Sequence, residues 1–194
     1  RDPKIINSGD YVFDVGGEYN KSTNRFDHHQ KGGAGFRPAA TSNVSIEYSS
    51  FGLIWKNFGI ELTGSEKATD MIDKCLVAPI DAFDNGFDLV KNIYDISPYF
   101  IQHFFLSMRP TCAEKNITND EMFLECVEIA KKILKREIIR ALDSILAEDK
   151  VIGIYQNTKD RRVMVLDEDY PYESILNNFT EPLFVIYPRQ SDDY

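Results

Sequence analysis

Asp27, His28 and His29 form the densest group of metal-competent side chains in the sequence, and a further acid, Asp14, precedes them. Neutral imidazole binds divalent transition metals, and carboxylates suit harder ions such as Mn²⁺ and Mg²⁺. Two of the three histidines of the chain are adjacent here. An adjacent pair alone is more often part of a solvated loop, but the acids before it favour a metal site.

A short strand must position the first of these acids. Tyr11 to Val15 is β-branched and aromatic around one acid, which predicts a buried strand with Asp14 near its carboxyl end. Gly16 and Gly17 end the strand, since glycine turns where other residues would be strained. Ligand sites in open α/β sheets form outside the carboxyl ends of strands, so Asp14 is expected to lie at such a site.

Two further acids, Asp81 and Asp84, stand before Asn85-Gly86 in an otherwise apolar stretch. Their spacing of three places both carboxylates on one face of a helix. Acids in an apolar context are unfavourable unless a cation satisfies them, and a metal ion is one answer. An exposed capping turn with solvated carboxylates is the alternative.

An acid at a strand end, Asp-His-His on the next loop and a later acid beside Asn-Gly are together typical of a binuclear metal site. Two metals can clamp a phosphoryl group and lower the pKa of a bridging water, whose hydroxide then attacks phosphorus. One histidine would bind metal, and its neighbour would donate to a phosphate oxygen. The pattern predicts a metal-dependent phosphodiester hydrolase.

The bulk composition restricts the class of protein further. The 194 residues are 43% hydrophobic and carry a net charge of −9, which provides a core but no broad basic footprint for nucleic acid. No apolar run approaches the ~20 residues that span a bilayer, so no membrane partner is expected. Three widely spaced cysteines form no zinc or disulfide pattern, which favours core thiols and an intracellular location.

The rest of the first 112 residues is predicted to be largely helical. Lys31 to Ala40 is a glycine-rich loop whose Arg37 either touches a phosphate or belongs to a plain connector. An aromatic stripe from Val44 predicts a helix that Gly59 ends, and Thr63 to Glu66 is a capping box for the next helix. Pro79 kinks or ends that helix, and a short helical stretch resumes before Asn85-Gly86.

The remaining sequence predicts a connecting helix over 118–148 and a smaller α/β domain over 149–194. Thr118 to Glu121 is a capping box, and the amphipathic pattern runs to about Ala147. Val151 to Tyr155 and Arg162 to Leu166 read as a hairpin, followed by a short helix near 172–177 and a strand over 183–187.

Four stretches of the sequence stand out together: Asp-Val-Gly-Gly-Glu-Tyr from Asp14, Arg-Phe-Asp-His-His-Gln from Arg25, Tyr-Ser-Ser-Phe-Gly-Leu-Ile from Tyr48 and Ile-Asp-Ala-Phe-Asp-Asn-Gly from Ile80. In these stretches the chain resembles the melanocyte proliferating gene family, a branch of the DHH phosphoesterase-like proteins. The resemblance implies an α/β fold in which a DHH-like parallel-sheet domain precedes the connecting helix. It also implies a manganese- or magnesium-dependent 3′-to-5′ exonuclease on single-stranded RNA, in the nucleus and mitochondrion.

Site roles follow from the resemblance position by position. Asp14 resembles the metal-bridging acid, and His28 resembles a metal ligand. His29 resembles the catalytic, phosphate-facing partner, with Asp27 orienting a histidine from behind. Asp84 resembles the last metal acid of related enzymes, and Asp81 competes with it for this role.

One departure from the family concerns the start of the chain. The family opens with a strand and loop reading roughly His-x-Gly-x-Phe-His-x-Asp-Glu, and the sequence here opens with Arg-Asp-Pro-Lys. We therefore expect the first strand of the sheet and part of the two-metal site to be missing, and the smaller domain to be incomplete at its end. A small-molecule phosphatase or pyrophosphatase and a non-catalytic metal-binding scaffold stay open as alternatives.

Overall fold

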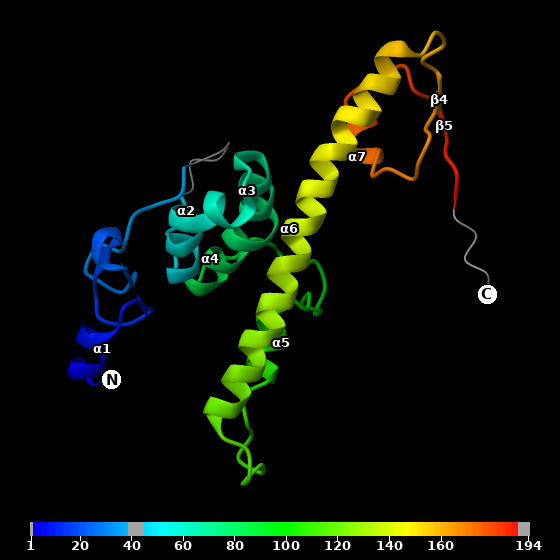
Figure 1. The fold of residues 1–194 in the computed structure, drawn as a ribbon. Coiled ribbons are helices and arrows are strands. Elements are labelled where there is room, and N and C mark those ends of the chain that lie inside the picture. The colour runs from blue at the N-terminus through cyan, green and yellow to red at the C-terminus, as the bar shows by residue number, and fades with distance from the viewer. Residues whose placement is uncertain (1, 39–44, 190–194) are drawn as a thin grey trace. The chain divides into compact units, whose positions relative to one another are not determined.

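The computed structural model describes residues 2–38 and 45–189, which form helices and two small sheets. The predicted mixed α/β class is confirmed, whereas a DHH-like sheet layout stays a prediction. The chain divides into two compact units, residues 1–135 and 136–194, and the longest helix contributes to both. Figure 1 shows the course of the chain by residue number. Our division at 112, 118 and 148 stays a prediction.

The first unit begins with a helix and a three-stranded sheet. The elements are α1 (Pro3–Ser8), β1 (Val12–Phe13), β2 (Tyr19–Asn20), the 3₁₀ turn η1 (Lys21–Thr23) and β3 (Arg25–Phe26). The strand order is β1-β3-β2, with β1 parallel and β2 antiparallel to β3. The strand that we predicted over 11–15 is shorter, because Asp14 adopts a φ of 57° and leaves the extended conformation.

Helices make up most of the rest of this unit. They are α2 (Ser50–Thr63), α3 (Glu66–Ile72), the π-helical turn η2 (Asp73–Val77), α4 (Ala78–Asp84) and α5 (Ile101–Ser107). The expected start of the first helix at Val44 lies outside the described residues. Tyr48 precedes the helix and is not part of it, because its N–H donates to the Gly35 carbonyl at 3.0 Å.

The predicted helix end at Gly59 is wrong. The helix α2 continues to Thr63, and Gly64, at a φ of 68°, ends it. Gly59 instead lets α3 approach closely, since a Cβ there would lie 2.7 Å from the Thr69 Cγ2 atom. The signal that we took for a stop therefore marks a contact between helices.

The next helix boundaries follow the sequence signals more closely. Ser65 caps α3 by accepting from the Ala68 N–H at 3.2 Å, so the capping residue is one of those in the predicted box but is not Thr63. Pro79 stands in the first turn of α4, directly after the π-helical turn, where its missing N–H is harmless. The predicted end of α4 at Asn85 and Gly86 is confirmed.

The long helix α6 runs from Asn119 to Asn157. Its predicted capping box is confirmed: the Glu121 N–H donates to the Thr118 hydroxyl, and the Glu121 carboxylate accepts from the Thr118 N–H. The predicted end near Ala147 and the strand over Val151 to Tyr155 are wrong. Val151 and Tyr155 are four positions apart, so the helix buries both side chains on one face. That burial outweighs the β propensity of the stretch.

The second unit has a two-stranded parallel sheet, β4 (Val163–Val165) with β5 (Phe184–Ile186), and a short helix, α7 (Glu173–Leu176). Both strands and the helix were predicted. The predicted hairpin of Val151 to Tyr155 with Arg162 to Leu166 is wrong, because β4 pairs with β5 instead. An apolar core fills this unit: Val151, Tyr155, Met164, Leu166, Ile175 and Leu176.

Two expectations from composition are also tested. Cys75 and Cys112 are exposed and Cys126 is half-buried, so the prediction of core thiols is wrong. Among the helices that the structure describes, none has the combined length and hydrophobicity that a bilayer crossing needs.

Candidate metal site

Two parallel strands end together and place two acids at one edge of the sheet. The register pairs Val12 with Arg25 and Phe13 with Phe26, so Asp14 and Asp27 both follow the last paired residues. The Asp14 N–H donates to the Phe26 carbonyl at 3.1 Å and extends this alignment by one residue. Phe26 is fully buried and anchors β3 in the core immediately before Asp27.

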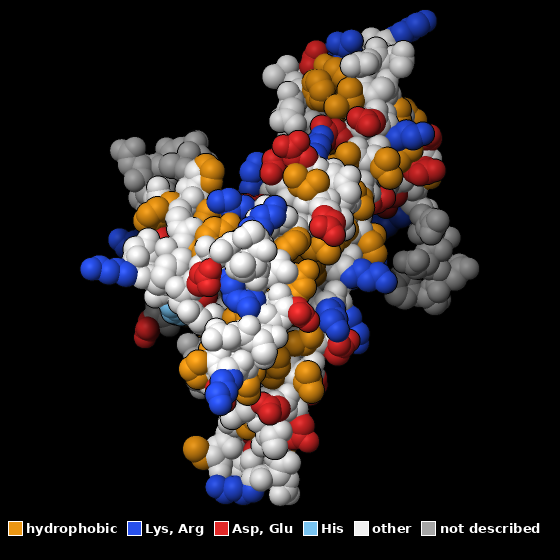
Figure 2. All heavy atoms as spheres, turned by 60° about the vertical axis from the view of Figure 1, so that its left-hand side comes forward, with side chains coloured by type: hydrophobic (Ala, Val, Ile, Leu, Met, Phe, Trp, Pro, Cys, Tyr) orange, Lys and Arg blue, Asp and Glu red, His pale blue; other side chains and the backbone are white. Residues whose placement is uncertain are grey.

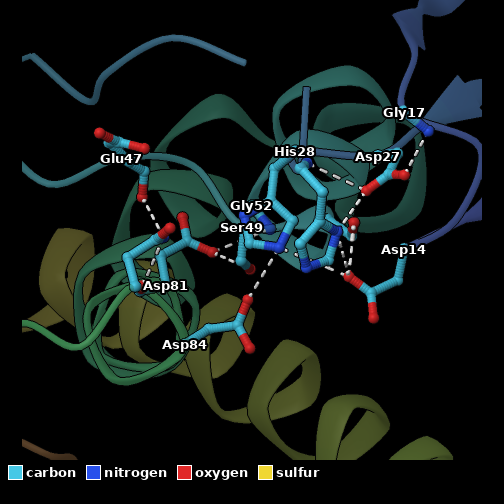
Figure 3. Close-up of polar contacts among 12 residues, drawn as sticks. Asp14, Gly17, Asp27, His28, Glu47, Ser49, Gly52, Asp81 and Asp84 are labelled. Atoms are coloured by element: carbon cyan, nitrogen blue, oxygen red, sulfur yellow. Dashed lines mark hydrogen bonds and ion pairs between the residues drawn. The ribbon is translucent and has the colours of Figure 1, made fainter. Parts of the chain in front are cut away.

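His28 is the centre of the site, and its side chain is only 8% exposed. Its Nε2 atom lies 3.4 Å from Asp14 Oδ1 and 3.2 Å from Asp84 Oδ2, and Figure 3 shows the two carboxylates on either side of the ring. Nε2 is buried and has no hydrogen-bond partner. Because an imidazole lone pair repels carboxylate oxygens, either a proton on Nε2 or a cation in front of it must offset this repulsion.

His29 is held by Asp27. Its Nδ1 lies 2.6 Å from Asp27 Oδ1, and its ring centroid is 4.2 Å from that of His28. The same Nδ1 is 3.8 Å from Asp14 Oδ1. Asp27 therefore contacts the second histidine of the pair and fixes its ring beside the first.

Asp27 is itself buried and well bonded. Its carboxylate accepts from the Gly17 N–H at 2.6 Å and from the His29 N–H at 3.1 Å. Burial opposes ionisation, but the hydrogen bonds from Gly17 and His29 outweigh it, so the pKa of Asp27 lies below its ordinary value of 3.8. Asp27 is therefore an ionised carboxylate, and the groups that it orients are the Gly17 N–H, the His29 N–H and the His29 ring.

The two acids of α4 have different surroundings. Asp84 is half-exposed and reaches His28, whereas Asp81 is completely buried. The Asp81 carboxylate accepts from the Ser49 hydroxyl at 2.5 Å, from the Gly52 N–H at 3.0 Å and from the Arg37 Nε at 2.7 Å. The cation that satisfies Asp81 in the structure is thus a guanidinium, and Asp84 is the acid that joins the histidine.

Arg37 is a buried residue that joins distant parts of the first unit. Its guanidinium bonds to Asp81 and Asp73 and lies over the Tyr48 ring, with 5.0 Å from Cζ to the centroid. Burial disfavours its charge, but the two acids overcome this and raise the pKa of Arg37. Burial raises the pKa of Asp81, against the hydrogen bond from Ser49 and the charge of Arg37. Neither the phosphate contact nor the plain connector that we considered describes this residue.

The donor set suits a divalent cation. Ligand atoms of Asp14, His28 and His29 all lie within 4.8 Å of one another, and no other such group of three occurs among the described residues, so Asp84 contacts His28 but stands outside this group. Carboxylate oxygens and imidazole nitrogen are ligands that Mn²⁺ accepts. A divalent cation or a proton at the buried Nε2 atom would satisfy both carboxylates. The site thus has the character of a candidate divalent-metal centre on a mixed α/β unit.

Comparison with known proteins gives the family. The family model described as "Uncharacterised protein family (UPF0160)", with the label MYG1_exonuc, matches residues 1–194. The chain therefore belongs to the MYG1 family, and the resemblance to the melanocyte proliferating gene family is confirmed. Its place among the DHH phosphoesterase-like proteins, and the missing opening motif, stay predictions.

The relatives are distant and longer than this chain. A MYG1 protein of Schizosaccharomyces pombe is 25% identical over 210 residues, covering 94% of this chain and 61% of the relative. The Bos taurus MYG1 exonuclease is 28% identical over 161 residues, covering 74% of this chain and 40% of the relative. The Homo sapiens MYG1 exonuclease is 35% identical over 99 residues, covering 44% of this chain and 26% of the relative. No solved structure matches the chain.

Sequence reasoning missed three contributors to the site. Ser50 donates its hydroxyl to Asp14 Oδ1 at 3.3 Å, the Gly17 N–H holds Asp27, and Arg37 pairs with Asp81. The glycine pair predicts a turn, but its sequence does not show that the Gly17 N–H donates to Asp27. Nothing local in the sequence marks Ser50 or the Arg37 pairing, which spans 44 positions.

Proposed function

We propose that this chain carries the histidine-centred part of the active site of a metal-dependent phosphodiester hydrolase, and that the whole protein is a 3′-to-5′ exonuclease on single-stranded RNA. The observation that carries the proposal is the buried His28 Nε2 atom between Asp14 and Asp84. Relatives in mouse and human are named MYG1 exonuclease, which supports a nucleic-acid substrate.

Each residue has a defined part in this proposal. Asp14, His28 and Asp84 would hold Mn²⁺ or Mg²⁺, with Asp81 excluded from the ligand set by its contacts to Arg37. When bound, two such cations would lower the pKa of the attacking water and neutralise charge on the phosphoryl group. The three ligands named are too few for two cations, so further ligands would come from the rest of the protein.

His29 and Asp27 act on the substrate side of the proposed site. Asp27 keeps its charge because of the Gly17 and His29 N–H groups, and it holds the proton on the Nδ1 atom of His29. A histidine held in this way has a fixed ring orientation, and its Nε2 atom would donate to a phosphate oxygen when that atom carries a proton. Asp27 thereby orients and polarises the group that receives the substrate.

The test has a binding step and a turnover step. Calorimetric titration of this chain with MnCl₂ should show binding that His28→Ala and Asp84→Asn weaken strongly and that Asp120→Asn, an exposed acid on α6, leaves unchanged. The full-length protein should then shorten 5′-labelled single-stranded RNA only with Mn²⁺ or Mg²⁺, and His28→Ala should abolish this activity. Unchanged cleavage by His28→Ala, or cleavage in chelator, would contradict the proposal.

A small-molecule phosphatase or pyrophosphatase is the second candidate function. The net charge of −9 favours it, since a long polyanion would be repelled. On the face drawn in Figure 2, Lys and Arg side chains are scattered among acidic and apolar ones. Competition between RNA and pyrophosphate in the same turnover assay separates the two functions. A preference for pyrophosphate would replace the exonuclease assignment, and metal binding without any hydrolysis would favour a scaffold.

The place of action is proposed on the resemblance alone. Nuclear and mitochondrial pools of RNA would both be substrates of such an exonuclease. Imaging of the tagged full-length protein tests this, and a location outside both compartments would contradict it.

A further inference from the structure

We propose that Arg37 and Asp81 are positioning residues, which set the distance between Asp14 and Asp84 on the two sides of His28. The inference rests on the proposed metal site and assigns a task to a buried ion pair that does not contact the metal. It also separates the roles of the two acids of α4.

Asp81 fastens α4 to the first turn of α2. Its Oδ1 atom accepts from the Ser49 hydroxyl at 2.5 Å and from the Gly52 N–H at 3.0 Å, while its Oδ2 atom faces Arg37. The contact is close, since a Cβ on Gly52 would lie 2.0 Å from Asp81 Oδ2. Only glycine at position 52 leaves room for the carboxylate.

Both carboxylates beside His28 are tied to this junction. Asp84 follows Asp81 by one helical turn of α4, so a shift of Asp81 moves Asp84 with it. On the other side, Ser50 adjoins Ser49 and donates to Asp14 at 3.3 Å. Figure 3 shows Asp81, Ser49 and Gly52 gathered on one side of His28 and Asp14 on the other.

Arg37 completes the junction from a third segment. Its Nε and Nη2 atoms lie 2.7 and 2.6 Å from Asp81 Oδ2, and Nη1 bonds to Asp73 on the π-helical turn before α4. The loop around Arg37 is in turn paired with the segment before α2, since the Arg37 N–H donates to the Ile46 carbonyl at 2.8 Å. The guanidinium thus fixes α4 and the turn before it against the loop that follows the histidines, while Asp81 links α4 to α2.

A buried ion pair is weak evidence for stability, because desolvating two charges opposes their attraction. Its use here is geometric, since a planar guanidinium bonds to a carboxylate in few orientations. Groups that orient metal ligands from behind affect metal affinity by about 10–100-fold when they are changed. The pair is therefore expected to matter more for metal binding than for folding.

The test is the double variant Arg37→Gln/Asp81→Asn, in which the new amide oxygen still accepts from Ser49 and Gly52. We expect Mn²⁺ affinity, measured by calorimetry, to fall about 10–100-fold while circular dichroism stays native. In metal-free protein, the NMR signals of the His28 ring should also shift, since Asp14 and Asp84 move relative to it. A folded double variant with unchanged affinity and unchanged His28 signals overturns the proposal.

A matched control is the exposed pair Arg162→Gln/Asp160→Asn in the second unit, which has the same kind of Arg–Asp contact, with Nη2 and Oδ2 2.7 Å apart. It should change neither the affinity nor the His28 signals. If the buried double variant does not fold, Gly52→Ala displaces Asp81 without removing a charge, and Arg37→Lys keeps the charge but not the planar contact. Both should weaken Mn²⁺ binding, and wild-type affinity in both overturns the proposal.

The two proposals fail in different ways. If the wild-type chain binds no Mn²⁺, the proposed function loses its support, and the His28 signals of the metal-free variants still decide the positioning role. If the wild type binds Mn²⁺ and the variants bind it equally well, the positioning role alone is rejected. If the spectrum of bound Co²⁺ shows a lost ligand in Asp81→Asn, then Asp81 is a metal ligand and not a positioning residue.

Discussion

The two compact units of this chain bury different kinds of side chain. All buried polar and charged residues among those described lie in the first unit: Asp27, Arg37, Ser49, Ser50, Thr63 and Asp81. The second unit buries an apolar cluster around Met164, and its Arg162–Asp160 pair is exposed on the surface. Apolar burial stabilises a fold directly, whereas buried charges need partners and bring little net stability. The difference indicates that the first unit is shaped for a site and the second for packing.

The largest expected effect is in the apolar core of the second unit. Met164→Ala removes a completely buried side chain and should lower the free energy of unfolding by about 2–5 kcal/mol. Urea denaturation measures this, and Val165→Ala, at an exposed position of the same strand, serves as the control. Mn²⁺ affinity should not change. Weaker metal binding in folded Met164→Ala would contradict the view that the first unit carries the site and the second unit only packs.

A smaller loss of stability is expected at Asp27. Asp27→Asn keeps the shape but removes a charge that accepts from Gly17 and His29, and hydrogen bonds to charged groups contribute about 1.5–3 kcal/mol. Thermal denaturation should show the loss, and calorimetry should show weaker Mn²⁺ binding, because the His29 ring is no longer fixed beside the ring of the ligand His28, 4.2 Å away. A variant as stable as the wild type would mean that the hydrogen bonds of the buried Asp27 carboxylate do not stabilise the first unit.

Acid should weaken the same contacts. The pKa of Asp27 is lowered from 3.8, so its stabilisation is fully present above that value and is lost as the pH falls through the lower pKa of the folded state. Hydrogen exchange of the Gly17 N–H, measured at descending pH and corrected for intrinsic rates, should show lost protection below about pH 4. Asp27→Asn should abolish this dependence, and an equally steep dependence in that variant would contradict the assignment.

The smallest effect is expected at the exposed ion pair of the second unit. Asp160→Asn breaks its contacts with Arg162, but both side chains are more than half exposed, and such pairs contribute little. The Tm should stay within experimental error of the wild type. A clear decrease would show that the second unit also depends on its charges and would remove the contrast between the units.

The sequence predicted which side chains would lie close together better than it predicted the fold around them. Asp14, His28 and Asp84 meet because two parallel strands end in register and because α4 ends at Asn85-Gly86, and both features have local signals. The role of Arg37 could not be predicted in this way. Its pairing with Asp81 spans 44 positions and depends on tertiary packing, which leaves no periodic trace.

The errors in the predicted secondary structure have a common physical cause. Val151 to Tyr155 has strand-like residues, yet an existing helix propagates through it because its apolar residues can be buried at a spacing of four. Gly59 has the composition of a stop signal, yet it allows two helices to approach. In both places tertiary packing overrode a correct reading of local propensity.

Anomalous diffraction from crystals grown with MnCl₂ tests the central claim most directly. The account predicts an anomalous peak within bonding distance of His28 Nε2 and of carboxylate oxygens of Asp14 and Asp84, with Asp81 still bonded to Arg37. A well-occupied peak elsewhere, or ordered Asp14, His28 and Asp84 side chains with no peak between them at saturating Mn²⁺, would contradict it.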